Sequence, residues 1–211
     1  MRISLQKMFL VSGVILVMGG CGNGSAQVED QMESLEEAPL QHELQTLIDY
    51  ENQLQDDFES ALEEDDSSVF AESTAAVFAN MDSRQTTLEN LNESVSTYES
   101  VQQELQEVSF SEDEAEIEDT VSAMTENLGD ITGTMESFLP RYEEALNGER
   151  DYFNSLGEDA ADYERFTDGV GIVNEHHEDL NEYYRSLNDS LTELNENKDR
   201  AREIINGEGE S

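Results

Sequence analysis

The sequence predicts an all-α protein, an elongated antiparallel up-and-down helical bundle with coiled-coil-like packing. Apolar residues recur with alternating spacings of three and four along most of the chain, which keeps one apolar seam facing a partner helix. No stretch of comparable length alternates with a period of two, as a half-buried strand would. Breaks in the pattern are rich in turn and capping residues. Four helices are therefore expected, with three as the alternative.

Four seams define the predicted bundle domain, residues 39–207. They run from Leu40 to Ala61, from Val77 to Val108, from Ile117 to Tyr142 and from Phe166 to Ile205. Polar residues occupy a few seam positions, namely Glu51, Arg84, His177 and Lys198. Such positions in a coiled coil are typical of a polar layer that specifies register.

The first break between seams is the weakest. The acidic stretch 63–66 is followed by Ser68, which can cap a helix that begins at Val69. If this break fails, the first two helices merge and the bundle has three members.

The later breaks have clearer signals. Ser111 and Glu114 have the spacing of a capping box, and Gly157 is expected to follow the end of the third helix. Pro140 lies inside that helix and should kink it or end it early. The last helix is expected to stop near residues 206–207, and residues 208–211 to form a disordered tail.

The N-terminus has the features of a lipoprotein signal peptide, residues 1–20. Arg2 and Lys7 precede an apolar run that is shorter than the ~20 residues needed to span a bilayer. The run ends in Gly19-Gly20-Cys21, which resembles the lipobox of bacterial lipoproteins. That resemblance implies cleavage between Gly20 and Cys21, a diacylglyceryl group on the Cys21 thiol, and attachment to the membrane. The alternative is an ordinary secretory site with a free thiol.

Residues 21–38 are predicted to be a lipidated cysteine followed by a flexible acidic tether. The stretch from residue 22 is small, polar and acidic, with no sustained period. A coil of this length would hold the folded body ~20–25 Å from the lipid.

The charge of the chain excludes one class of partner. Without residues 1–20, it keeps 51 acids against eight bases. Nucleic acid is excluded because its phosphates require clustered Lys and Arg. So acidic a surface resembles secreted proteins of halophilic or halotolerant bacteria, and the alternative is a polyanion that gathers cations or docks on a basic partner.

No catalytic or metal site is expected from the sequence, and no cofactor. His176 and His177 are adjacent and would point about 100° apart on a helix, and His42 is remote, so they do not form a zinc set. The acidic stretches 63–66 and 112–119 lack the glycine of a calcium loop. No nucleophile or phosphate-binding motif is present, and an enzyme is therefore not predicted.

Aromatic residues concentrate in the C-terminal half, and most fit the seam. Any that are exposed could stack on sugar rings or on a partner protein. The candidates for such surface contact are Tyr152, Phe153, Tyr163 and Tyr183.

The stretch 142–174 resembles the YkyA-type lipoproteins of Firmicutes. The likeness is in Tyr142, Leu146, Glu149, Tyr152, Phe153 and Leu156, followed by Phe-x-x-Gly at residues 166–169. It implies a non-enzymatic cell-wall-binding lipoprotein on the outer face of the membrane, with peptidoglycan or envelope proteins as partners. The alternative function is a coiled-coil envelope scaffold or protein-interaction module without glycan binding.

Overall fold

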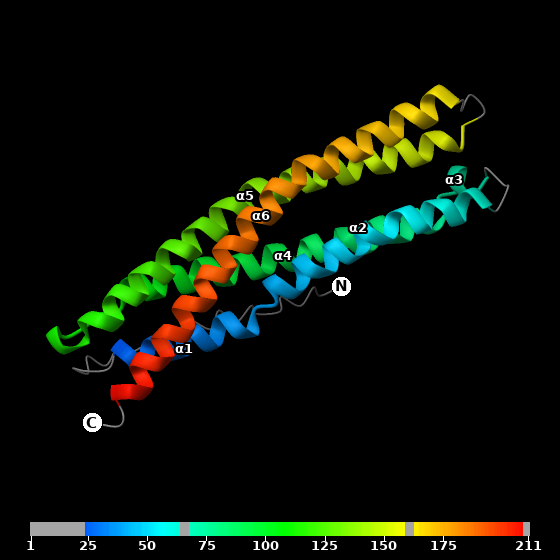
Figure 1. Cartoon of the computed structure of the whole chain (residues 1–211). Coiled ribbons are helices and arrows are strands. Elements are labelled where there is room, and N and C mark those ends of the chain that lie inside the picture. Colours follow the sequence, from blue (N-terminus) through cyan, green and yellow to red (C-terminus); the bar gives the residue numbers. More distant parts are fainter. Residues whose placement is uncertain (1–23, 64–67, 159–162, 209–211) are drawn as a thin grey trace, which may run out of the picture.

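The computed structural model describes residues 24–63, 68–158 and 163–208, and within these ranges it contains helices and no strand. Figure 1 shows how the helices are arranged. Their bounds are α1 Gly24–Glu37, α2 Leu40–Glu63, α3 Ser68–Ala71, α4 Ala76–Glu107, the short 3-10 helix η1 Glu112–Glu114, α5 Ala115–Leu156 and α6 Tyr163–Glu208.

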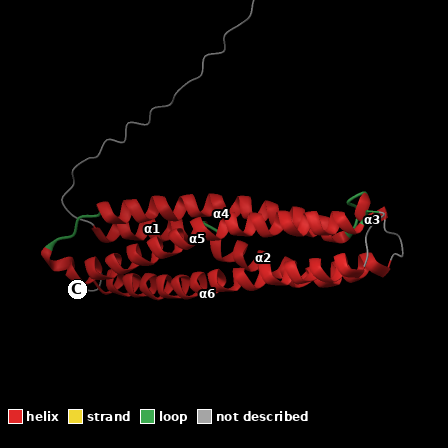
Figure 2. Cartoon of the chain, turned by 90° about the horizontal axis from the view of Figure 1, so that it is seen from above, coloured by secondary structure: helices red, strands yellow, loops and turns green. Residues whose placement is uncertain are grey.

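The helices form an elongated antiparallel bundle (Figures 1 and 2), which confirms the predicted fold class. Helices α1 and α2 follow one another along α4, α4 packs against α5, and α5 packs against α6. We call the four long members legs: α1 with α2, then α4, α5 and α6. At 46 residues, α6 is ~70 Å long. The turn between α4 and α5 lies at one end of the rod, the base, and α3 lies at the other, the tip.

The predicted flexible tether is wrong for residues 24–37, because they form α1 and pack on the bundle. Val28, Met32 and Leu35 are 0, 1 and 3% exposed. Their spacing of four and three extends the first seam upstream of Pro39, where dense acidic residues conceal it in the sequence. Pro39 separates α1 from α2 without removing either from the bundle.

The second predicted helix, from Val69 onward, is also corrected, since α3 ends at Ala71 and α4 begins at Ala76. The N–H groups of Thr74 and Ala75 both donate to the carbonyl of Val69, at 2.8 and 3.0 Å. Ser73, the residue before Thr74, has a φ of 55°. This tight turn reverses the chain at the tip, so α2 and α4 are separate helices.

Pro140 does not end α5, which runs unbroken to Leu156. Proline removes one backbone donor, so the carbonyl four residues earlier has no helical partner. Pro140 and Glu136 both lie on the exposed side of α5, where water can hydrate that carbonyl.

The predicted capping box between α4 and α5 is present. The Ser111 N–H donates to Oε2 of Glu114 at 2.9 Å, and the Ser111 Oγ lies 2.9 Å from the same atom. These bonds lower the pKa of Glu114.

Gly157 follows the end of α5 as expected, but a left-handed backbone is not the reason for glycine at this position. Its φ is −83°, which any residue adopts. A Cβ at Gly157 would instead lie 2.3 Å from the backbone N of Ala71, so glycine lets α3 approach α5.

Several expectations fall on residues outside those described. They concern the signal peptide, Cys21, the acidic residues 64–66, the side chain of Tyr163, and residues 209–211. Helix α6 itself extends to Glu208.

Candidate functional site

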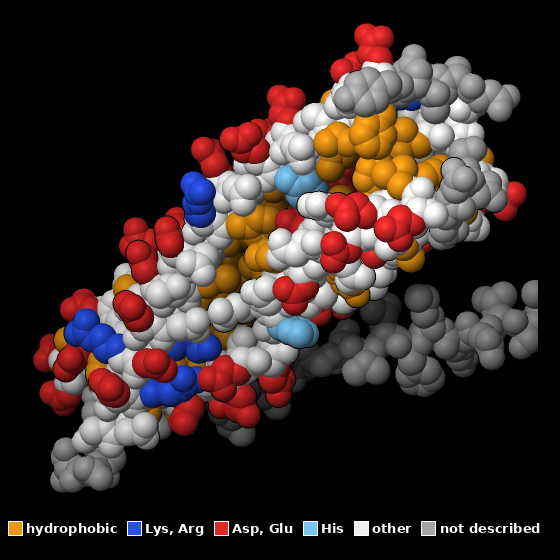
Figure 3. Space-filling model, turned by 45° about the vertical axis from the view of Figure 1, so that its right-hand side comes forward, with side chains coloured by type: hydrophobic (Ala, Val, Ile, Leu, Met, Phe, Trp, Pro, Cys, Tyr) orange, Lys and Arg blue, Asp and Glu red, His pale blue; other side chains and the backbone are white. Residues whose placement is uncertain are grey.

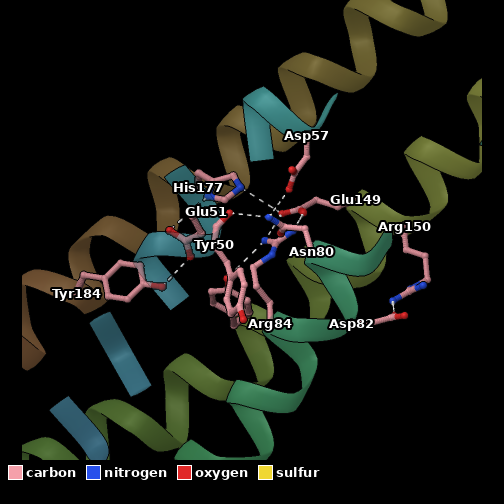
Figure 4. A network of polar contacts seen from close by, with 11 residues as sticks. Tyr50, Glu51, Asp57, Asn80, Asp82, Arg84, Glu149, Arg150, His177 and Tyr184 are labelled. Atoms are coloured by element: carbon pink, nitrogen blue, oxygen red, sulfur yellow. Dashed lines mark hydrogen bonds and ion pairs between the residues drawn. The ribbon is translucent and has the colours of Figure 1, made fainter. Parts of the chain in front are cut away.

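A buried polar layer crosses the bundle, and each leg contributes to it. Glu51 lies on α2, Arg84 on α4, Glu149 on α5 and His177 on α6 (Figure 4). Three of these are polar seam positions visible in the sequence. Glu149 is one of the residues in the stretch 142–174 that resemble the YkyA-type lipoproteins. The sequence does not predict that it lies opposite Arg84.

Arg84 and Glu149 form the centre of the layer, and each side chain is 1% exposed. The guanidinium donates through Nη1 to Oε1 of Glu149 at 3.1 Å, and through Nη2 to Oε2. Burial opposes charge on both groups, but these bonds outweigh it and raise the pKa of Arg84. The pKa of Glu149 is lowered despite burial, by its ion pairs with His177 and Arg84. The pair is therefore ionised and bidentate.

His177 connects this pair to α2. Its Nε2 lies 3.2 Å from Oε1 of Glu149, and its Nδ1 lies 3.7 Å from Oε2 of Glu51. Burial lowers the pKa of His177, but the two carboxylates raise it to about 9. The imidazolium therefore persists at neutral pH and bridges α5 and α2.

Further hydrogen bonds extend the layer. Tyr184 of α6 donates to Oε1 of Glu51 at 2.7 Å, and Nη1 of Arg84 donates to Tyr142 Oη at 3.4 Å. Burial raises the pKa of both tyrosines. Two carboxylates and two cations thus compensate each other, and the arrangement can hold four legs in one register.

The other polar candidates lie apart from this layer. His176 packs over Gly148, where a Cβ would come within 2.9 Å of its ring, and His42 is exposed on α2. Lys198 lies closer to the base, 4.0 Å from Glu36, and burial lowers its pKa. Among the residues that the structure describes, no group of three or more His, Cys, Asp or Glu is placed to hold a metal ion.

An aromatic groove opens beside the layer, between α2 and α6 near the tip. Figure 3 shows its apolar side chains gathered on one face, next to a histidine. The groove has a volume of about 670 Å³, and His177 and Glu51 of the polar layer belong to its lining. Its remaining lining is Asn52, Leu54, Gln55, Phe58, Glu59, Leu62, Tyr152, Phe153, Phe166, Val170, Val173 and Asn174.

Aromatic rings form the floor of this groove. Phe58 stacks on Phe166 with centroids 5.8 Å apart, and it contacts Phe153 at 5.3 Å. Tyr152 meets Phe58 at 6.4 Å and donates its hydroxyl to the carbonyl of Phe166 at 3.2 Å. The tips of α2, α5 and α6 are thus held together by rings.

Gly169 makes this packing possible, and its replacement tests it. A Cβ there would lie 2.0 Å from the ring of Tyr152. We expect Gly169→Ala to lower the free energy of unfolding by about 1–3 kcal/mol, because a well-packed ring must shift. Gly171→Ala is the control, since a Cβ at Gly171 meets nothing within 4 Å. That variant should gain up to ~1 kcal/mol from helix propensity. Urea unfolding measures both, and equal stability of the two variants would contradict the packing.

The four predicted surface aromatics have different places. Tyr152 and Phe153 are 8 and 2% exposed, so they are floor residues and not projecting contacts. Their rings pack at the point where three helices converge, which periodicity alone does not show. Tyr183 is half-buried against Phe138 and lines a polar hollow of about 940 Å³ between α5 and α6. Tyr163 begins α6.

None of the helices within the described ranges is long and apolar enough to cross a bilayer. A family model whose description is "Putative cell-wall binding lipoprotein" matches residues 24–204. The chain belongs to the YkyA family. The resemblance based on residues 142–174 is confirmed, and the match extends from the start of α1 into α6. No significant match was found among curated proteins or among solved structures.

The YkyA-like stretch contributes to both features of the candidate site. Tyr142 and Glu149 belong to the polar layer, while Tyr152, Phe153 and Phe166 form the groove floor. Several of the residues that carried the resemblance thus pack between helices in the tip half of this YkyA-family bundle.

Proposed function

We propose that this protein is a non-enzymatic lipoprotein, anchored on the outer face of the membrane through Cys21, whose helical rod binds the cell wall. The family match carries the proposal, because it covers every leg of the bundle. The lipobox-like Gly19-Gly20-Cys21 supports the anchor. The non-enzymatic role is supported by the polar layer, whose ionised groups are paired with each other.

The position of the start of α1 determines which end of the rod would lie near the lipid anchor. Gly24 follows Cys21 by three residues, a reach of at most ~11 Å. A Cβ at Gly24 would contact the ring of Phe110, in the turn between α4 and α5. The lipid would therefore lie beside the base of the rod, and the aromatic groove would lie in the half of the rod that is farther from the membrane.

Charge restricts which wall component can be bound. With a formal net charge of −41, the chain repels anionic wall polymers. Uncharged glycan strands of peptidoglycan do not incur this repulsion.

Sedimentation with purified peptidoglycan tests wall binding. The proposal expects the protein to co-sediment, and to remain bound in molar salt because charge attraction is not the source of affinity. Recovery of all the protein in the supernatant would reject it.

An envelope scaffold without glycan binding is the second candidate. It is favoured by Leu62, which is 47% exposed and lines the aromatic groove together with Phe58 and Val170, because such a contiguous apolar surface can dock a partner protein. A molar mass that rises with concentration in light scattering, without peptidoglycan binding, would support this candidate instead.

The anchor is tested by Cys21→Ala. Without the thiol no diacylglyceryl group can be attached, and two acyl chains are what makes such anchoring stable. We expect the variant to leave the membrane fraction for the medium or the soluble envelope fraction, measured by immunoblotting. A Ser25→Ala variant, which keeps Cys21, should remain with the membrane. Membrane retention of Cys21→Ala would show that another element anchors the chain.

A further inference from the structure

We propose that the aromatic groove binds an uncharged N-acetylated glycan strand. This inference rests on the proposed wall-binding function and deepens it by naming the site and the class of ligand. Three independent observations support it: the charge of the groove, the chemistry of its lining, and its place on the rod.

The groove carries little net charge, although the protein as a whole is very acidic. Its ionisable residues are Glu51, Glu59 and His177. Glu51 faces the imidazolium of His177 at 3.7 Å and accepts from Tyr184 at 2.7 Å, so its charge is compensated. Glu59 is the remaining carboxylate and accepts from the side-chain amide of Gln55 at 2.8 Å. A polyanion would be repelled by the surrounding surface, and a polycation would find little to pair with here. The charge therefore favours a neutral ligand.

The lining combines an apolar floor with amides at the rim. Phe58, Phe166, Val170 and Val173 are half-buried, so part of each side chain faces the groove. Asn52 and Gln55 on α2 lie across from Asn174 on α6, and all three are exposed lining residues. A side-chain amide has two donors and an acceptor, which suits hydroxyl and acetamido groups. The apolar floor suits the C–H faces and acetyl methyl groups of amino sugars.

The groove is also large enough and suitably placed. Its volume of about 670 Å³ lies within the range of ~300–1,000 Å³ that is usual for ligand sites. Its residues on α6, Phe166 to His177, precede the end of that helix at Glu208 by ~45–65 Å of helix. A rod anchored at its base therefore presents this groove in the half that lies farther from the lipid, toward the wall.

The test compares two double variants of the detergent-solubilised, full-length lipoprotein. Asn52→Ala with Asn174→Ala removes rim amides from both sides of the groove. Asn92→Ala with Asn188→Ala removes exposed amides outside the groove and is the matched control. Helical dichroism and melting temperature should be the same for both, because all four residues are exposed.

The probes are peptidoglycan stripped of anionic polymers and a soluble N-acetylglucosamine hexamer. We expect the rim variant to lose at least tenfold in apparent affinity for both probes, and the control variant to match the parent protein. The hexamer should also shift the methyl resonances of Val170 and Val173 in NMR spectra.

The experiment distinguishes failure of this inference from failure of the proposed wall-binding function. If parent and rim variant bind stripped peptidoglycan equally, the groove is not the site, although wall binding stands. If the parent binds only peptidoglycan that keeps its anionic polymers, the inference of a neutral glycan is overturned. If the parent binds no wall preparation, the proposed function itself fails. Should the rim variant melt earlier than the control, Gln55→Ala provides the same comparison at one exposed residue.

Discussion

Arg84→Met is expected to lower the free energy of unfolding by about 3–5 kcal/mol, which is the usual cost of removing one partner of a buried ion pair. The variant leaves Glu149, which is 1% exposed, without its bidentate partner. His177 remains 3.2 Å from this carboxylate and compensates only part of the loss. Urea unfolding followed by dichroism at 222 nm measures the change.

Two further variants show whether the lost stability comes from the buried charge. Arg84→Met combined with Glu149→Leu should recover most of the loss, because no carboxylate then remains uncompensated. Arg150→Met breaks the neighbouring pair with Asp82, whose side chains are 36 and 71% exposed, and should cost below ~1 kcal/mol. A similar cost for Arg84→Met and Arg150→Met would mean that the layer contributes little beyond an ordinary surface pair.

Stability is expected to fall as the pH rises from about 6.5 to 9, because His177 loses its proton over this interval. Its pKa is raised from 6.5 to about 9 in the folded chain, so its contribution is complete below pH 6.5 and lost above pH 9. A shift of this size corresponds to at most about 3 kcal/mol. The groups that face the imidazole are Glu149 of α5 and Glu51 of α2. Urea midpoints at half-unit pH intervals measure the slope.

His177→Gln is the control for this pH dependence. It should be less stable than the parent at pH 6.5 and should show a flat profile between pH 6.5 and 9. His42→Gln replaces an exposed histidine and should keep the slope of the parent. If the slope persisted in His177→Gln, another group would have to be responsible.

The polar layer shows how much of the packing between helices the apolar seams predict. Glu51, Arg84 and His177 each stand out as polar residues on an apolar stripe, so a polar layer could be predicted. Which polar positions meet depends on how antiparallel legs slide past each other. A heptad repeats about every two helical turns, so the seams are compatible with several registers. The seams therefore do not identify Glu149 as the partner of Arg84.

The aromatic groove shows a different limit. The sequence indicated that aromatics gather in the C-terminal half, and it singled out Tyr152 and Phe153 for exposed contacts. Both are instead buried below the groove, because three helices converge there and Gly169 lets the Tyr152 ring approach α6. Exposure at such a point depends on neighbours that are distant in sequence.

The sequence by itself determined the helical class, the antiparallel order of the legs, the capping box at Ser111 and the family. These follow from spacing, charge and short motifs, which act within a few residues of the chain. Only the tertiary structure decided that residues 24–37 join the bundle, that Arg84 pairs with Glu149, and that a groove opens near the tip. Those features arise between legs, where packing and desolvation select one register and one set of neighbours from many that local patterns allow.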